Sequence, residues 1–149
     1  MKLEAEIVQK KFQSEYHKAI VNIVFTYNWI IEKQTKLLKP YDISLQQYNI
    51  LRILRGQHPN PATVKLIKER MLDKMSDVSR LVEKLRVKDL VDRHICQHDR
   101  RNVDVCITEK GLELLKELDP KEREMEDLMS NLDENEIEQF NIYLDKLRG

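Results

Sequence analysis

Apolar residues recur at three- and four-residue spacing through the first forty residues, which is the pattern of one face of an α-helix. The members of this stripe are Ile7, Val8, Phe12, Tyr16, Ile20, Ile23, Val24, Tyr27, Ile30 and Ile31. We expect the helix to end at Lys39-Pro40, because the residue before a proline avoids the helical conformation. A helix of about 30 residues spans about 45 Å. That is longer than one compact layer needs, so part of the stripe is expected to meet a second chain.

Three shorter helices are predicted to follow. Ser44-Leu45-Gln46-Gln47 fits an S-x-x-Q capping box that opens the first of them. A turn at residues 56–63, GQHPNPAT, separates it from the second, and a tight break near residues 72–74 precedes the third, MSDVSRLVEKLRVKDL. The inward faces are expected to be Leu45, Tyr48, Leu51 and Leu54 in the first helix, Val64, Ile67 and Met71 in the second, and Val78, Leu81, Val82 and Leu85 in the third.

After Leu90 the apolar period changes from about 3.6 to two. Apolar and polar residues alternate in VDRHICQH, residues 91–98, and again in NVDVCIT, residues 102–108. The residues from His98 to Asn102 connect the two alternating segments. This pattern predicts a β-hairpin with a polar tip.

Two helical segments are predicted beyond the hairpin. The first starts at residues 108–110, carries Leu112, Leu115 and Leu118 on one face, and is expected to be interrupted or kinked at Asp119-Pro120. The second has a D-x-x-E cap at Asp133 and Glu136 and a hydrophobic staple between Leu132 and Ile137. Its apolar face is expected to be Ile137, Phe140, Leu144 and Leu147.

Helical arms therefore flank three short helices and a hairpin. That order predicts a mainly α protein with a small β-hairpin wing, the winged helix-turn-helix pattern. Three glycines and four prolines in 149 residues suit a mostly helical chain, and the length suits one domain with helical extensions.

Charge is distributed unevenly, although 26 Lys+Arg balance 26 Asp+Glu over the whole chain. Residues 61–101 hold eleven Lys/Arg against seven Asp/Glu, whereas residues 109–149 hold six against thirteen. Such asymmetry indicates a middle part that faces nucleic acid and an acidic C-terminal part that faces elsewhere.

Two groups of polar residues are candidates for DNA contacts. The outward face of the helix at residues 75–90 combines short polar and cationic side chains that would let it sit deep in a major groove. Its candidate residues are Ser76, Asp77, Ser79 and Arg80 for the groove, and Lys74 and Lys84 for phosphates. The hairpin tip carries Asp99, Arg100 and Arg101. An arginine there could enter a minor groove, held in place by the aspartate. Ordinary surface charge is the alternative interpretation of both groups.

Together these segments resemble the MarR family of bacterial winged-helix regulators over nearly the whole chain. MSDVSRLVEKL is similar to the family's recognition helix, S-x-V-S-R-L-V-x-x-L, and DRRNVDVCITEKG to its wing, D-x-R, a strand and L-T-x-x-G. The terminal helical arms match those that intertwine in the family's dimers. Asp89 stands where the family commonly has glycine before the wing, and Ile107 replaces a leucine; aspartate tolerates the left-handed conformation better than most residues.

The resemblance implies a homodimeric transcriptional regulator, of the repressor type or an activator, that binds double-stranded DNA at a pseudo-palindromic operator. It implies an N-terminal dimerisation helix at 1–40, a winged helix-turn-helix DNA-binding domain at 41–110, and C-terminal dimerisation helices at 111–149. Arg101 corresponds to the wing arginine of the minor groove and Asp99 to its brace, while Arg100 could reach a phosphate.

Relatives often bind small aromatic or anionic ligands between the DNA-binding lobe and the arms. Four aromatic residues lie in segments that could line such a cleft, with packing in the core as the alternative for each: Tyr27, Trp29, Tyr41 and Tyr48.

The two cysteines, Cys96 and Cys106, offer a thiol-based redox sensor as a second hypothesis, since a hairpin could bring them opposite each other. With His94 and His98 they are also zinc-ligand types. However, those histidines lie about 13 Å apart along an extended strand, so we expect no metal. The simplest interpretation is that both cysteines pack the wing.

No enzyme motif is present, and no cofactor is expected. The charged N-terminus is not a signal peptide, and no apolar run approaches the roughly 20 residues of a membrane helix, so we expect a cytoplasmic protein with no membrane partner. A winged-helix module that binds protein in place of DNA is the rival hypothesis.

Overall fold

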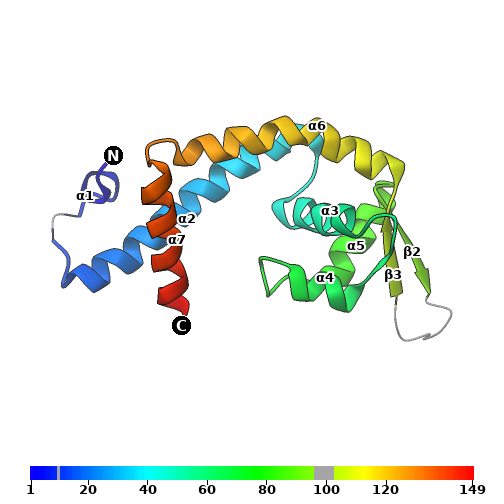
Figure 1. Ribbon diagram of the computed structural model, residues 1–149, viewed down its shortest axis with the longest axis horizontal. Helices are drawn as coiled ribbons and strands as arrows, with labels where there is room; N and C mark the ends of the chain where they lie inside the picture. Colours follow the sequence, from blue (N-terminus) through cyan, green and yellow to red (C-terminus); the bar gives the residue numbers. More distant parts are fainter. Residues whose placement is uncertain (10, 96–102) are drawn as a thin grey trace.

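The computed structural model describes residues 1–9, 11–95 and 103–149, and it forms an arch (Figure 1). One end of the arch is a lobe built from α3 (Leu45–Gln57), α4 (Val64–Arg70), α5 (Val78–Val87), β2 (Val91–Ile95) and β3 (Val103–Ile107). The other end holds α1 (Leu3–Glu6), α7 (Glu134–Arg148) and the first half of α2 (Glu15–Leu38). α6 (Glu109–Glu126) crosses the top beside α2. The predicted fold class, mainly α with a small β wing, is confirmed.

Local capping explains where the helices of the lobe begin. Ser44 Oγ accepts the N–H of Gln47 at 3.1 Å, and Gln47 Oε1 accepts the N–H of Ser44 at 2.9 Å, so the predicted capping box is confirmed. The short 3₁₀ helix η1 (Lys39–Tyr41) joins α2 to this cap. In the same way, Thr63 Oγ1 accepts the N–H of Leu66 at the start of α4.

The predicted hairpin is confirmed, and its register pairs Val91 with Ile107 and Ile95 with Val103. The tip that we predicted at residues 98–102 lies outside the described residues. A further strand, β1 (Ala62–Thr63), pairs with β3 and gives the sheet the order β1-β3-β2 among the described residues. We had predicted only a turn at residues 56–63, because two residues are too few to show an alternating pattern.

The core of the lobe lies between these helices and the sheet. It includes Leu51, Ile67, Leu85 and Val105, all with no exposed surface or almost none. Gly111 lets α6 approach the base of the wing, because a Cβ there would lie 2.4 Å from the carbonyl oxygen of Leu90.

The predicted single helix at residues 1–40 is wrong, because the structure contains two helices, α1 and α2, in that range. α2 starts afresh at Glu15, where the Ser14 side chain accepts the N–H of His17 and caps it. An ion pair between Glu4 and Lys18, at 2.5 Å, holds the N-terminal segment against α2. The prediction failed because the spacing of the apolar residues continues across the break before Ser14.

At Asp119-Pro120 we predicted an interruption or a kink, and the interruption is absent, since α6 continues through Pro120 to Glu126. A proline inside a helix removes one hydrogen bond to the carbonyl four residues earlier. Here that carbonyl belongs to the exposed Lys116 and can be hydrated. The short 3₁₀ helix η2 (Asp127–Met129) ends this segment, and the predicted cap of the last helix, Asp133 with Glu136, is confirmed.

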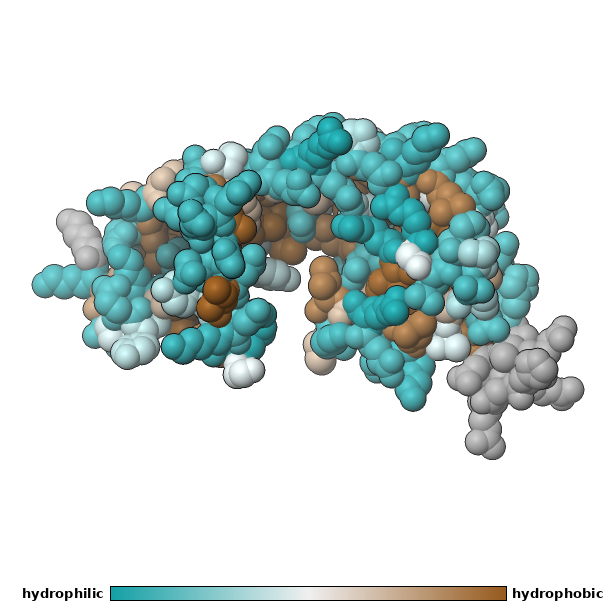
Figure 2. All heavy atoms as spheres, in the orientation of Figure 1, coloured by the Kyte–Doolittle hydropathy of each residue, from teal (hydrophilic) through white to brown (hydrophobic). Residues whose placement is uncertain are grey.

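The end of the arch formed by α2 and α7 leaves apolar side chains in water. Within α7 no residue is buried, and within α2 only Leu38 is. The exposed apolar residues of the two helices are Tyr16, Ile20, Ile23, Val24, Tyr27, Phe140, Ile142, Tyr143 and Leu147. Apolar surface also lines the hollow beneath the arch (Figure 2). In the part of the chain that the structure describes, no helix is both long and apolar enough to cross a membrane.

Candidate nucleic-acid interface

α5 is amphipathic, although Val87 at its C-terminal end is exposed. Val78, Val82 and Leu85 are buried in the lobe, whereas Ser79 and Arg80 are exposed on the outside. Val78 is the first helical residue, so Ser76 and Asp77, which we expected on the same outward face, precede the helix. Asp77 is the N-cap, and its Oδ1 accepts the N–H of Arg80 at 3.1 Å. Asp77 therefore fixes the start of α5.

The charges on α5 are paired unequally. Glu83 accepts two hydrogen bonds from the Arg86 guanidinium, at 2.8 and 3.0 Å, and lies 3.8 Å from Arg93. The hydrogen bond from Arg86 lowers the pKa of Glu83 and keeps it ionised. For Arg80, by contrast, no acidic side chain lies within ion-pair distance in residues 1–9, 11–95 and 103–149. The cation on the first turn of α5 is therefore available to an external anion or a base edge.

Hydrogen bonds also hold the turn between α4 and α5. Asn49 Oδ1 accepts the N–H of Leu72, and Asp73 Oδ1 accepts the N–H of Met75, both at 3.0 Å. The Met75 N–H is the main reason that the pKa of Asp73 is lowered. Lys74, which we predicted at a phosphate, donates its ammonium to the carbonyl of Glu69 at 2.6 Å. Its charge therefore lies at the C-terminal end of α4, where it is attracted by the helix dipole.

The three predicted residues of the wing tip, Asp99, Arg100 and Arg101, lie outside the described residues, and their roles stay predictions. The two strands that carry the tip are described, and the first of them, β2, follows closely after α5. Asp89, which lies between α5 and β2, has a φ of 58°. It therefore occupies the left-handed conformation that its place in the sequence required.

Cys106 lies opposite Asp92 in the hairpin, which rules out the possibility that the hairpin pairs it with Cys96. Cys96 itself lies outside the described residues. Burial raises the pKa of the Cys106 thiol, and the nearby Asp104 and Asp92 add to the effect. A thiol with a raised pKa is a poor nucleophile at neutral pH, which argues against Cys106 as a sensor. Across the described ranges, no three His, Cys, Asp or Glu side chains are grouped as a metal site.

A cavity of about 560 Å³ lies between α2, α3, the turn before α5 and α6. Of the four aromatic candidates, Tyr27 and Tyr48 line it, whereas Trp29 and Tyr41 do not. Tyr41 packs against the core of the lobe, and Trp29 carries the Lys33 ammonium 5.9 Å from its ring centre. The other lining residues are Ile30, Ile31, Gln34, Leu45, Gln46, Asn49, Arg52, Met71, Leu72, Asp73, Lys74 and Met125.

A polar cluster beside this cavity joins α3 to α6. Tyr48, only 7 % exposed, donates its hydroxyl to Glu122 Oε1 at 2.8 Å, and Arg52 Nη1 lies 2.7 Å from the same oxygen. One helical turn further along α3, Arg55 pairs with Asp119 at 2.7 Å. The cluster links the lobe to the top of the arch, and sequence spacing could not reveal it because its members are about seventy positions apart.

Burial raises the pKa of Tyr48 to about 12, and its bond to Glu122 adds to the shift. The folded state then keeps the hydroxyl proton between about pH 10 and 12, where the unfolded chain loses it. Stability contributed by this tyrosine is therefore present below pH 10 and is lost as the pH rises through 12. The free energy of unfolding, measured with urea, should fall between pH 9 and pH 11. This fall should be smaller in Tyr48→Phe than in the unchanged protein, by roughly 1 kcal/mol. Equal losses in both proteins would contradict the assignment.

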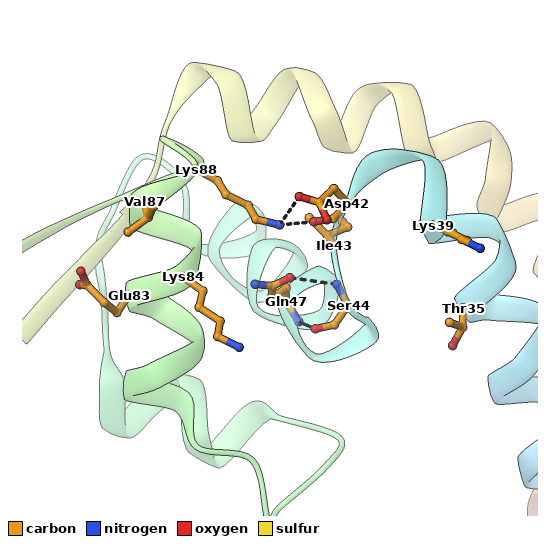
Figure 3. Close-up of a pocket in the computed structure, with 10 residues that line it drawn as sticks. All are labelled: Thr35, Lys39, Asp42, Ile43, Ser44, Gln47, Glu83, Lys84, Val87 and Lys88. Carbon is orange, nitrogen blue, oxygen red and sulfur yellow. Dashed lines mark hydrogen bonds and ion pairs between the residues drawn. The ribbon is translucent and has the colours of Figure 1, made fainter.

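A second cavity, of about 610 Å³, lies between the end of α2, the start of α3 and the second half of α5 (Figure 3). Lys88 Nζ binds both the carboxylate of Asp42, at 2.9 Å, and its carbonyl oxygen. Lys84 points into the space in front of α3. The structure thus separates Lys84 from Arg80: both are exposed on α5, but Lys84 borders this cavity.

Comparison with known proteins gives consistent matches. The model of the MarR family matches residues 41–102. The HTH-type transcriptional regulator SarZ of Staphylococcus aureus (strain USA300) is 29 % identical over 114 residues, which cover 69 % of this chain and 76 % of SarZ.

Solved structures extend the similarity to both arms. A MarR transcription factor from Planctomyces limnophilus is 30 % identical with a TM-score of 0.71, and the match covers 92 % of this chain and 99 % of that one. The S. aureus MepR–DNA complex is 25 % identical with a TM-score of 0.76, covering 92 % and 97 %. BpsR of Bordetella bronchiseptica, whose DNA binding is regulated by 6-hydroxynicotinic acid, has the same fold at 18 % identity, with a TM-score of 0.77 and coverage of 89 % and 99 %.

Proposed function

Because this chain belongs to the MarR family of transcriptional regulators, we propose that it acts as a homodimer that recognises a pseudo-palindromic DNA operator. Each protomer places the first turns of α5 in a major groove and the wing in the neighbouring minor groove. A two-fold dimer presents two such surfaces, and the operator then repeats the same half-site on opposite strands.

The observation that carries this proposal is the exposed Arg80 on the capped first turn of α5. Its helix start is fixed by Asp77, and the acid one turn further on, Glu83, is already occupied by Arg86. An exposed guanidinium on a helix turn whose backbone is fixed suits bidentate contact with guanine. MepR, which has the same fold, was solved in complex with DNA.

The wing part of the proposal rests on the sequence. In the D-x-R pattern, Asp99 aims Arg101 at a minor groove, and Arg100 lies beside them for a phosphate. Lys74 and Lys84 would contact the phosphates beside the major groove. They are less free to do so than Arg80, because the Lys74 ammonium is bound to the carbonyl of Glu69 and Lys84 borders a cavity.

The arms supply the dimer interface. The exposed apolar residues of α7 and most of those of α2 lie at the end of the arch away from α5, whereas Tyr27 borders the 560 Å³ cavity. Burying such residues against a partner removes apolar surface from water, at about 25 cal/mol per Å². Residues 1–40 and 111–149 therefore form dimerisation arms around the DNA-binding domain at 41–110.

A small aromatic anion is the proposed effector, and the 560 Å³ cavity is its site. The cavity combines apolar walls, such as Ile31 and Met125, with the Arg52 guanidinium, which a ligand carboxylate would share with Glu122. It also touches the turn that leads into α5. BpsR, with the same fold, responds to an aromatic acid. A ligand that fits only one position of the lobe would shift the population toward that position. Candidate acids that alter neither melting temperature nor DNA affinity would argue against this site.

A binding titration across salt concentration tests the DNA-binding proposal. Neutralised phosphates release counterions, so the logarithm of the affinity should fall linearly with the logarithm of the salt concentration. Even one phosphate contact per protomer implies about a tenfold loss between 50 and 200 mM salt. An affinity that does not change with salt would refute phosphate-anchored binding.

A further inference from the structure

Leu72, at the start of the turn that precedes α5, is 87 % exposed, and Met75 in the same turn is 92 % exposed. Met75 lies two residues before the N-cap Asp77, at the end of the helix where Arg80 begins the outward face. The other methionine of this region, Met71, is only 1 % exposed and packs in the core of the lobe. Met75 therefore has no buried site of its own within the described lobe.

The backbone around Met75 is held in place. Asp73 Oδ1 accepts the N–H of Met75 at 3.0 Å, and the Asp73 carbonyl accepts the N–H of Ser76 at 3.3 Å. Asn49 anchors the start of the same turn through the N–H of Leu72. These bonds fix where the Met75 side chain leaves the backbone, and the side chain itself is exposed. An apolar side chain in water favours burial against an apolar partner.

The residues of the turn before α5 face two different parts of the surface. Leu72, Asp73 and Lys74 line the 560 Å³ cavity, whereas Met75 does not. Met75 instead adjoins the N-terminal end of α5, and the N-terminal residues of a recognition helix are the ones that reach base edges in a major groove. The apolar feature on the floor of that groove is the C5-methyl group of thymine.

We propose that Met75 packs against a thymine C5-methyl group in each half-site and thereby makes the operator specific for thymine at that position. This inference rests on the proposed DNA-binding function. The unbranched, polarisable thioether suits the contact, because methionine adapts its shape to an irregular apolar surface. It adds a base-reading residue to the helix face formed by Ser79 and Arg80.

Replacing thymine by deoxyuracil tests the contact, because it removes only the methyl group. With an operator selected from random DNA, each symmetric thymine pair is replaced in turn and the affinity is measured for the full chain, for Met75→Ala and for Met75→Leu. For one pair, the unchanged chain should lose about fourfold in affinity per half-site. Met75→Ala should bind both operators equally, and Met75→Leu should keep most of the difference. Val87→Ala truncates another exposed apolar side chain, at the far end of α5, and is the matched control that should keep all of the difference.

The outcomes separate this inference from the function on which it rests. If no DNA is selected, the proposed function fails and the inference fails with it. If an operator is selected but Met75→Ala keeps the full thymine preference, only the inference is overturned. The same holds if Met75→Ala changes the dimer–monomer equilibrium in sedimentation without changing the preference, because Met75 would then face a partner chain.

Discussion

Replacing Arg80 with alanine should reduce operator affinity by about 100-fold while leaving fold and dimerisation intact. One bidentate arginine–guanine contact contributes about 1–3 kcal/mol, and a two-fold dimer loses it twice, so about 2.8 kcal/mol is a moderate expectation. The side chain is exposed and has no acidic partner in the described part of the chain. Fluorescence anisotropy with a labelled operator gives the affinity, and circular dichroism melting monitors the fold.

Arg86→Ala is the matched control for this experiment. It removes the same type of side chain from the same helix, but that guanidinium is already bound to Glu83. We expect at most a few-fold loss of affinity for the control. If Arg80→Ala and Arg86→Ala weaken binding equally, the outward face of α5 acts through net charge alone, and Arg80 does not read a base.

An aspartate in place of Ile20 should convert the protein to monomers and abolish operator binding as a consequence. Ile20 is 63 % exposed in the single chain and lies in the middle of the apolar stripe of α2. In a two-fold dimer the substitution occurs twice. Losing about 2 kcal/mol of apolar burial in each protomer raises the dimer dissociation constant by about 1,000-fold, before the burial of two carboxylates is counted. Sedimentation velocity over a concentration series measures the change.

Asn22→Asp adds the same charge to the opposite side of α2 and serves as the control. Asn22 is exposed and two positions from Ile20, which puts it outside the stripe. It should leave the dimer intact. An Ile20→Asp protein that stays dimeric would place the interface elsewhere and would leave the exposed apolar residues of both arms unexplained.

Local signals account for the elements that the sequence predicted well. The capping boxes at Ser44 and Asp133 each depend on two side chains three residues apart, and the change of apolar period after Leu90 marks the hairpin. The break before α2 was missed because the apolar spacing runs across it, and only the Ser14 cap signals it. The continuity of α6 through Pro120 was missed because proline usually breaks a helix interior, and spacing does not show that Lys116, four residues earlier, is exposed.

The candidate site was predictable in outline but not in its division of roles. Ser79 and Arg80 follow from helical periodicity, whereas Asp77 caps the helix and Lys74 binds Glu69. An aspartate just before an apolar helical run is a usual N-cap signal, so Asp77 could have been recognised. The contact of Tyr48 and Arg52 with Glu122 joins residues about seventy positions apart. Only the folded chain brings them together.

Selection from a random pool of double-stranded DNA tests the central claim most directly. We expect enrichment of a pseudo-palindrome with two half-sites about one helical turn apart, centre to centre, and loss of that enrichment with Arg80→Ala. Enrichment of a single asymmetric site would contradict two-fold recognition. No enrichment at all, from a protein that sediments as a dimer, would contradict DNA reading and favour a winged-helix module that binds protein.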